Sequence, residues 1–177
     1  MLDLWLLSRI TVLIFCICVV LYGAWVVWPL VIGAAWIPTP TETGRKILEL
    51  AKVREDDVLV DLGSGDGRII IMAAEDYGAT AIGIEADPLR VLWSRRAIRR
   101  RSLENKVHVI QGNFFNQDLS SATVVFVYQC EGVNRRLKDK LASELKPGTR
   151  IVSFSHPFDG WTPVETTEKP DIYLYVV

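Results

Sequence analysis

The sequence contains few of the residues that hold metal ions or cross-link a chain. There are two histidines, His108 and His156, and three cysteines. Cys16 and Cys18 lie in an apolar segment and Cys130 lies far along the chain, so no disulfide framework is indicated. None of these residues has the spacing typical of a metal site, and we expect no metal in the protein.

The sequence also lacks an excess of charge of either sign. It has 20 lysines and arginines against 21 aspartates and glutamates, for a net charge of −1. Such a chain has no whole-molecule attraction for nucleic acid, which we do not expect as a partner. No internal repeat or low-complexity tract is present, and 177 residues suffice for one domain with a full core.

A run without any charged residue extends from residue 10 to residue 37. It is longer than the ~20 residues that a membrane helix needs. Trp5 and Trp36 bracket it, where aromatic side chains would meet the two interfaces of a bilayer. We predict a membrane anchor over residues 1–37, with one span over about 10–37 in the lipid bilayer, and a second domain over residues 38–177.

A cleaved signal peptide is the main alternative, because the small residues 33–35 resemble a cleavage point. The run is longer than the ~7–15 apolar residues of a signal peptide, and Arg9 is the one basic residue before it. A soluble core helix is not favoured, since the run has no polar face. By the positive-inside rule the domain faces the cytoplasm, because four basic residues follow the run: Arg45, Lys46, Lys52 and Arg54.

The stretch from Val58 to Glu85 carries the main functional pattern. An apolar run at 58–60 predicts a buried parallel strand, residues 68–76 predict a helix, and residues 80–84 predict a second strand. Between the first strand and the helix the sequence reads DLGSGDG, whose glycines permit positive φ angles and close approach of a ligand. The stretch is therefore a strand–glycine turn–helix–strand unit that ends in an acid.

The glycine spacing and the acids favour one class of cofactor. Dinucleotide sites use G-x-G-x-x-G to rest a pyrophosphate on a helix N-terminus, whereas here Arg68 occupies the third glycine position. Asp61 would repel a pyrophosphate but pair with an amine, and Glu85 can accept both hydroxyls of a ribose. The pattern favours S-adenosylmethionine, with a tight turn that binds no ligand as the alternative. The predicted cofactor residues here are Asp61, Gly63, Ser64, Gly65, Asp66, Glu85 and Ala86.

Two prolines precede the helix expected from Gly44 to about Lys52. Pro38-Thr39-Pro40 is stiff and not helical, and Thr41 or Thr43 is expected to cap the helix. The segment 38–40 is interpreted either as a spacer after the membrane or as a lid over the methionine end of the cofactor.

An arginine-rich helix is expected from Pro88 to about Ser102. Its basic residues indicate, in order of preference, a solvated face, attraction to anionic lipid head groups, or contact with an acidic substrate or RNA. Trp93 is expected to pack inward.

The remaining pattern completes an open α/β fold with helices on both faces of a parallel sheet and a terminal β-hairpin. Strands are expected at 107–110, 123–128 and 150–155, a helix at 133–145, and the hairpin strands up to 167 and at 172–176.

Groups at the carboxyl ends of these strands should face the ligand crevice. Asn113 is a candidate to hydrogen-bond the amine of adenine, with Phe114 against the ring, and an ordinary turn is the alternative. Tyr128 and Gln129 are placed to line the channel of the methyl acceptor. His156 is a candidate base, although a histidine beside a proline is more often a loop residue.

Several motifs together resemble a known family. DLGSGDGR at 61–68 and Glu85 resemble class I S-adenosylmethionine-dependent methyltransferases. The resemblance extends over about residues 36–177 to archaeal broad-specificity protein-lysine methyltransferases and to mitochondrial enzymes that methylate a lysine of the ATP-synthase c-subunit or the adenine-nucleotide translocase. The further motifs are PTP at 38–40, GIEADP at 83–88, VNRRL at 133–137, ELKPGTRIVS at 144–153 and GWTP at 160–163.

The resemblance implies a Rossmann-like class I methyltransferase sheet and an enzyme that N-methylates protein lysines. It implies that Asp61, Gly63 and Gly65 hold the methionine moiety of the cofactor and that Glu85 holds the ribose. Asn113 stands where the family usually has an aspartate near the adenine, so that contact departs from the family pattern.

The resemblance also implies which residues lie near the acceptor lysine. These are Thr39, Tyr128 and the strand end 153–156, and the catalytic candidates are therefore Tyr128, Thr39 and His156. A membrane anchor favours membrane proteins with an accessible lysine as substrates, by raising effective concentration. The alternatives are methylation of RNA, a lipid or a small molecule, and a membrane-bound protein that binds the cofactor without catalysis.

Overall fold

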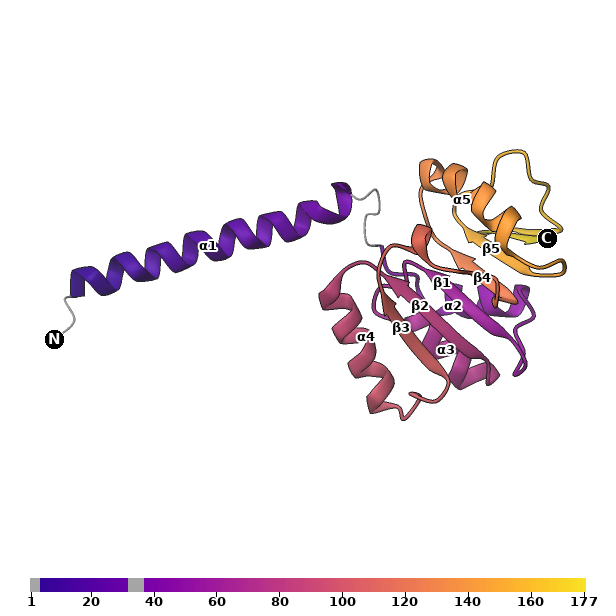
Figure 1. Ribbon diagram of the computed structural model, residues 1–177, viewed down its shortest axis with the longest axis horizontal. Helices are drawn as coiled ribbons and strands as arrows, with labels where there is room; N and C mark the ends of the chain where they lie inside the picture. The colour runs from indigo at the N-terminus through magenta and orange to yellow at the C-terminus, as the bar shows by residue number, and fades with distance from the viewer. Residues whose placement is uncertain (1–3, 32–36) are drawn as a thin grey trace. The chain divides into compact units, whose positions relative to one another are not determined.

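The computed structural model describes residues 4–31 and 37–177, and the chain divides into two compact units, residues 1–37 and 38–177 (Figure 1). The first unit contains one helix, α1 (Leu4–Val31). Its segment Trp5–Ala24 has a mean hydropathy of 2.3, and its length and composition suffice to cross a membrane. The expected apolar helix is present, whereas the predictions on Trp36 and on 33–35 lie outside the described residues.

The second unit is built on a seven-stranded sheet in the order β3-β2-β1-β4-β5-β7-β6. The strands β1 to β5 run parallel, and β7 runs antiparallel to both β5 and β6. The predicted α/β architecture with a terminal hairpin is thereby confirmed. The strands are β1 (Val58–Leu62), β2 (Thr80–Glu85), β3 (Val107–Gln111), β4 (Val124–Val127), β5 (Arg150–Phe154), β6 (Glu165–Glu168) and β7 (Asp171–Val176).

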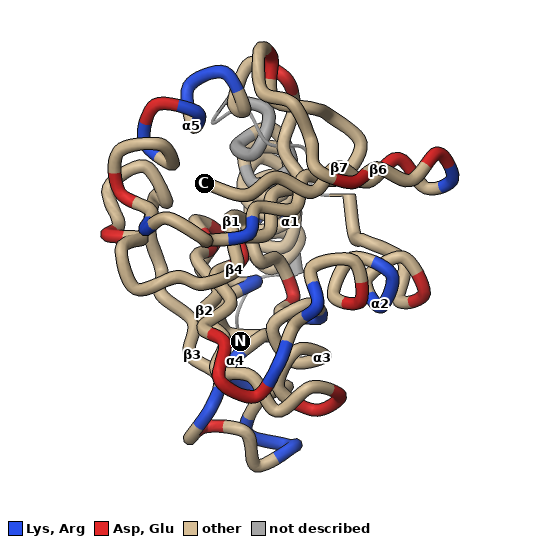
Figure 2. Tube along the Cα trace, turned by 90° about the vertical axis from the view of Figure 1, so that its right-hand side faces the viewer, with Lys and Arg blue, Asp and Glu red and all other residues tan. Residues whose placement is uncertain are grey.

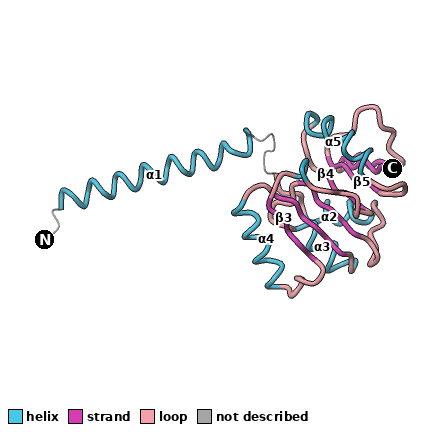
Figure 3. The backbone as a smooth tube through the Cα atoms, viewed as in Figure 1, coloured by secondary structure: helices cyan, strands magenta, loops and turns pink. Residues whose placement is uncertain are grey.

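Among the described residues of this unit, α2 precedes the first strand, and three further α-helices and one short 3-10 helix connect the strands β1 to β5 (Figure 3). Gly78, with a φ of 73°, ends the helix after β1 in the left-handed conformation that glycine adopts without strain. Asp87 caps the helix after β2 by accepting from the backbone amide of Leu89 at 2.8 Å. The helices are α2 (Thr41–Leu50), α3 (Arg68–Tyr77), α4 (Pro88–Arg100), η1 (Phe114–Asn116) and α5 (Glu131–Glu144).

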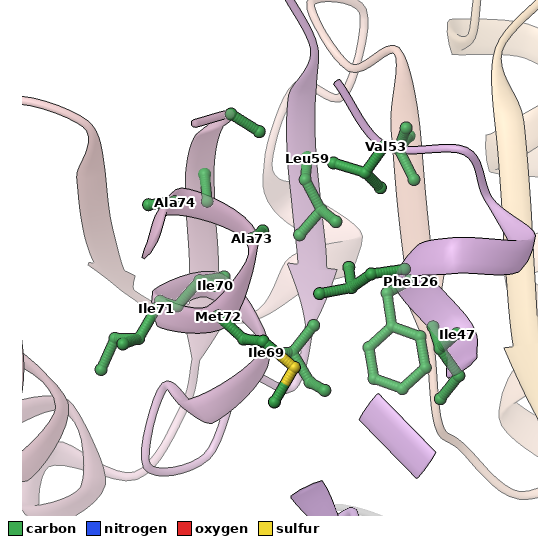
Figure 4. Close-up of a cluster of buried hydrophobic side chains, with 14 of the residues drawn as sticks. Ile47, Val53, Leu59, Ile69, Ile70, Ile71, Met72, Ala73, Ala74 and Phe126 are labelled. Carbon is green, nitrogen blue, oxygen red and sulfur yellow. The ribbon is translucent and has the colours of Figure 1, made fainter. Parts of the chain in front are cut away.

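Two apolar layers cover the two faces of the sheet. The helices α2, α3 and α4 pack on one face, where Ile47, Ile70 and Phe126 belong to one buried cluster (Figure 4). The helix α5 packs on the other face, where Leu137 belongs to the second cluster. β1 contributes to both layers because its side chains alternate: Leu59 lies in the first layer, and Val60 and Leu62 lie in the second.

Two local predictions are wrong. Neither Thr41 nor Thr43 caps α2, because the helix begins at Thr41 and its N-cap residue is Pro40, without a side-chain cap. Trp93 does not pack inward, since 49% of it is exposed on the outer side of α4. The sheet side of α4 is instead filled by Val91 and Ile98.

Candidate active site

The predicted site residues gather at the carboxyl edge of the parallel strands. Leu62, at the end of β1, is paired in register with Ile84 of β2 on one side and with Val127 of β4 on the other. The strand order reverses between β1 and β4, and open α/β sheets bind ligands at such a switch point.

The turn after β1 is made of glycines in the left-handed region. Gly63, Gly65 and Gly67 have φ angles of 92°, 56° and 83°. A Cβ atom on Gly63 would lie 2.5 Å from Nε2 of Gln129, and one on Gly67 would meet Oγ of Ser94. Other residues would therefore clash as well as strain the backbone, and the turn keeps a bare backbone beside the crevice.

Ser64 fills the space under this turn. It is buried, and its amide donates to the carbonyl of Ile84 at 3.1 Å. A Cβ atom on Gly83 would collide with the Ser64 hydroxyl, so Gly83 leaves room for it. The hydroxyl is buried without a hydrogen-bond partner among the described residues, and we assign it a packing role.

Glu85 is held rigidly at the end of β2. Its Oε2 accepts from the backbone amide of Gly65 at 2.8 Å, and its Oε1 accepts from the amide of Asp87 at 2.8 Å. A carboxylate oxygen has two lone pairs, so both oxygens retain capacity for a further donor. The neighbouring Ala86 is exposed at the same edge.

Asp61 is the most unusual group of the site. Only 3% of it is exposed, and no described residue donates a hydrogen bond that lowers its pKa. Burial, together with the negative charges of Glu85 and Asp66, raises the pKa of Asp61 well above its ordinary value. Three carboxylates, of Asp61, Glu85 and Asp66, therefore lie at this edge of the sheet, with Arg90 4.0 Å from Oε1 of Glu85, and a bound cation would offset the free-energy cost of the Asp61 charge.

Asp66 and Arg68 connect the glycine turn to the segment before α2. Arg68 binds both carboxylate oxygens of Asp66, at 3.0 Å through Nε and at 2.6 Å through Nη2. Burial alone raises the pKa of Asp66, but the hydrogen bonds and charge of Arg68 outweigh it and keep the pKa below its ordinary value. Arg68 also donates to the carbonyl of Thr39 at 2.8 Å, and Thr39 is 5% exposed. The segment 38–40 is therefore docked on the domain beside the glycine turn.

The residues expected near adenine follow β3. Asn113 is exposed, and its side-chain oxygen accepts from the amide of Phe115 at 3.0 Å, so it caps η1. Phe114 is half-buried, with its ring centroid 4.8 Å from that of Phe115. The amide of Gly112 donates to the carbonyl of Glu85 at 2.9 Å, which ties this loop to the end of β2.

The residues expected near the acceptor follow β4. Tyr128 is half-buried, and its ring centroid lies 4.5 Å from that of Phe154 at the end of β5. Gln129 is buried and donates from Nε2 to the carbonyl of Leu62 at 2.8 Å. Gln129 thus braces the end of β1 beside Gly63, so its amide is already engaged by the protein.

A buried network shapes the loop after β5. Asn134, on the first turns of α5, donates to the carbonyl of His156 at 2.9 Å and to Oγ of Ser153 at 3.3 Å. The Ser153 hydroxyl donates to the same carbonyl at 2.5 Å. His156 is half-buried, and its backbone rather than its ring anchors the loop. The sequence motif VNRRL contains Asn134, but nothing local in it indicates these contacts.

The site geometry fits S-adenosylmethionine, the cofactor expected from the sequence. Asp61, a carboxylate without a cationic partner in the described part of the chain, lies beside a turn whose three glycines have positive φ angles. The methionine end of this cofactor carries an ammonium and a sulfonium, which suit an acidic cradle, whereas a diphosphate would be repelled.

Comparison with known proteins identifies the family. Residues 61–165, more than half of the chain, match the family described as the ANTKMT methyltransferase domain. The chain belongs to the ANTKMT methyltransferase family. The predicted resemblance and the prediction of a methyltransferase are thereby confirmed.

Relatives of this methyltransferase include proteins from all three domains of life. A protein-lysine N-methyltransferase of Saccharolobus islandicus is 42% identical over 149 residues, which cover 80% of this chain and 92% of the relative. The human lysine N-methyltransferase of the ATP-synthase c-subunit is 30% identical over 132 residues, 75% of this chain but 56% of that protein. A crystal structure described as an RNA methyltransferase from Salinibacter ruber, in complex with S-adenosyl-L-homocysteine, is 42% identical with a TM-score of 0.78, covering 79% of this chain and 93% of that one.

Proposed function

We propose that the protein transfers methyl groups from S-adenosylmethionine to lysine side chains of other proteins. The observation that carries the proposal is Asp61, a buried carboxylate with a raised pKa beside Glu85 and Asp66. A ligand with an ammonium and a sulfonium neutralises that cradle, whereas a phosphate adds to its negative charge. The identity of 42% with a relative named as a protein-lysine N-methyltransferase supports lysine as the acceptor.

Residues of the glycine turn have separate parts in holding the donor. When bound, S-adenosylmethionine supplies a methyl group activated by its sulfonium sulfur. Asp61 pairs with the ammonium of the donor, and the bare backbone at Gly63 and Gly65 lets the methionine moiety lie against the chain. Glu85 accepts from the ribose hydroxyls with the lone pairs that its two amide partners leave free.

The acceptor amine must arrive without its proton. The rings of Tyr128 and Phe154 make a partly apolar wall at the ends of β4 and β5, and such a wall lowers the pKa of a lysine beside it. The chain then contributes mainly by aligning the neutral amine, with no covalent step on the protein. Tyr128 or His156 assists proton loss, and Thr39 lines the acceptor side from the docked segment.

In this proposal α1 is an uncleaved, single-pass anchor, and the methyltransferase domain faces the cytoplasm. Support comes from the 20 residues Trp5–Ala24, whose mean hydropathy is 2.3, and from the basic residues that follow the apolar run. Tethering raises the effective concentration of substrates in the same membrane. Membrane proteins with a lysine exposed on the cytoplasmic side are therefore the proposed substrates.

RNA is the second candidate acceptor. The observation in its favour is the description of the Salinibacter ruber structure, at 42% identity, as an RNA methyltransferase. The net charge of −1 opposes it, because proteins that hold RNA generally present an excess of positive charge.

The test separates these acceptors in one experiment. Membranes that contain the full chain are supplied with S-adenosylmethionine labelled in its methyl group, and label is followed in protein, RNA and lipid. We expect label in protein that survives ribonuclease, that is lost when lysines are acetylated beforehand, and that mass spectrometry locates on lysine. Label confined to RNA or lipid would contradict a lysine acceptor.

Two aspartate variants establish that the label comes from this site. Asp61→Asn is expected to abolish incorporation, whereas Asp139→Asn, which removes an exposed carboxylate on α5, is expected to retain it. Absence of label with the unaltered protein on every substrate fraction would instead support binding of the cofactor without catalysis.

A further inference from the structure

The outer side of α4 exposes large apolar side chains. Leu89, Leu92 and Trp93 are 43%, 55% and 49% exposed, although the opposite side of the helix is buried on the sheet. Their spacing of three and four residues places them on one stripe of the helix. Neighbouring exposed side chains of this size form a contiguous apolar patch, and large patches of this kind mark interaction sites.

Arginines continue the same stripe toward the C-terminal end of α4. Arg96, Arg99 and Arg100 are exposed, and no described acidic side chain forms an ion pair with them. By contrast, Arg95 donates to the carbonyl of Val109 at 2.8 Å, and Arg101 pairs with Glu75 at 3.2 Å. The helix itself contains no acidic residue. Figure 2 colours the basic residues of the chain blue and the acidic residues red.

Helical geometry places all six side chains on one face. At about 100° per residue, they fall within an arc of about 120°, opposite the buried side of the helix. We call this surface the α4 face; it consists of Leu89, Leu92, Trp93, Arg96, Arg99 and Arg100.

We propose that the α4 face docks on the surface of an anionic phospholipid bilayer. Tryptophan and leucine side chains enter the boundary between head groups and acyl chains, while arginines pair with lipid phosphates. The partner of the α4 face should be an anionic surface, because the charges of the face are all positive. None of them forms an ion pair within the described domain. RNA is a poorer occupant, since two exposed leucines add nothing to phosphate binding.

Docking through this face would orient the active site. α4 begins directly after Glu85 and Asp87, so the apolar end of the α4 face lies at the carboxyl edge of the sheet, beside the cofactor residues. The domain would then hold its catalytic edge at the membrane surface. This consequence rests on the proposed function and restricts its substrates to lysines near the head-group layer; the docking itself does not depend on it.

The experiment places a photoreactive benzoylphenylalanine at Leu92 in the full chain, reconstituted into vesicles of phosphatidylcholine with or without phosphatidylglycerol. The control carries the same group at Val164, which is 62% exposed before β6. We expect lipid adducts at position 92 that increase with phosphatidylglycerol, at a yield several-fold above that at 164. Equal yields at both positions, or adducts at 92 with a second copy or with added RNA, would overturn the proposal.

Charge reversal supplies the second arm. Arg96→Glu, Arg99→Glu and Arg100→Glu together should lower the adduct yield at position 92 at least about fivefold, which corresponds to the attraction of one arginine for an anionic surface. The matched control, Arg54→Glu, Arg135→Glu and Lys169→Glu, makes the same charge change at exposed positions outside α4 and should leave the yield unchanged. An unchanged yield in the first triple variant would also refute the proposal.

Failure of this proposal and failure of the proposed function give different results. Retention of the protein in the vesicles after carbonate extraction reports on α1, and methylation of a soluble lysine peptide reports on the chemistry. We expect both to be unchanged in the α4 triple variant, because none of its residues belongs to the cofactor site.

Discussion

At the scale of single residues, the buried carboxylate of Asp61 lowers the folding stability of the free protein and favours binding of a cationic ligand. Asp61 is buried at the end of β1 with acidic neighbours and no compensating hydrogen bond from a described residue. An ionised carboxylate in such a position costs free energy in the free protein. Its retention is explained if a cationic ligand occupies the crevice during function.

The first prediction concerns the stability of Asp61→Asn. Because the folded-state pKa of Asp61 is raised, its contribution to stability is fully present below the unfolded pKa and is lost as pH rises through the folded pKa. At neutral pH the variant should therefore be more stable than the unaltered protein, because a neutral amide avoids the cost of ionising the buried carboxyl, which is about 1.4 kcal/mol for each unit by which the folded-state pKa is raised. Thermal unfolding in detergent measures the difference, which should shrink on acidification; a less stable variant at neutral pH would contradict it.

The second prediction concerns the pH dependence of donor binding. A bound cation lowers the pKa of Asp61, so binding releases a proton at pH values between the lowered pKa of the complex and the raised pKa of the free protein. Affinity for S-adenosylmethionine should then fall as pH decreases, by up to about tenfold per unit for one linked proton. Calorimetry in two buffers of different ionisation enthalpy measures the proton release directly. Affinity that does not change on acidification would exclude this role for Asp61.

Residues of the site differ in how far the sequence predicts them. The positions of Asp61 and Glu85 at the ends of neighbouring strands could be predicted because one short strand–turn–helix–strand unit contains both. Gln129 and Asn134 could not be given their structural roles, because their partners lie far along the chain: the Leu62 carbonyl is 67 residues from Gln129. Only folding of the sheet brings such groups together.

At the scale of elements, Arg68 connects the glycine turn to the segment 38–40. It occupies the position of a third glycine at the start of α3, and it joins the glycine turn, through Asp66, to the carbonyl of Thr39. The segment 38–40 is therefore held against the domain, although its prolines alone are compatible with a free spacer.

The third prediction tests this connection. Arg68→Gln should release the segment 38–40, because glutamine cannot replace both the bidentate pair with Asp66 and the bond to Thr39. Hydrogen–deuterium exchange should increase at Thr39 and at the first turn of α2, and the KM for the acceptor should rise. Arg45→Gln, which removes an exposed pair with Asp76, is the control and should change neither. Unaltered exchange at Thr39 in the Arg68 variant would contradict the role of this arginine.

The sequence predicts the helices and strands better than it predicts the burial and capping of single residues in them. Apolar runs, and the glycines that mark turns between them, predict the strands and helices because these signals are local in the sequence. The prediction for Trp93 was wrong because the helical spacing of Val91, Ser94 and Ile98 sets the buried side of α4 and leaves the tryptophan outside. Pro40 was not predicted as the N-cap of α2, because Thr41 and Thr43 are of a residue type that is more common at N-caps.

At the scale of the whole molecule, the chain combines a methyltransferase domain with a long apolar helix. The segment Trp5–Ala24 is long and apolar enough to cross a membrane. In the proposed function, a bilayer covers this apolar surface.

The fourth prediction follows from this combination. The full chain should remain in membranes after carbonate extraction, whereas Leu13→Arg combined with Ile17→Arg should release it, because two charges within the span oppose insertion at about 2.5–3.5 kcal/mol each. Leu13→Ile with Ile17→Leu preserves hydrophobicity and serves as the control. Release of the unaltered chain by carbonate would show that α1 is not a membrane anchor.

The most direct measurement of the whole account is calorimetric titration of the purified full chain with S-adenosylmethionine. We predict binding at one site for the unaltered protein and for Asp139→Asn, and binding weaker by about a hundredfold or more for Asp61→Asn, because breaking a buried ion pair costs about 3–5 kcal/mol. Absence of binding by the unaltered protein, or equal affinity in the Asp61 variant, would contradict the account.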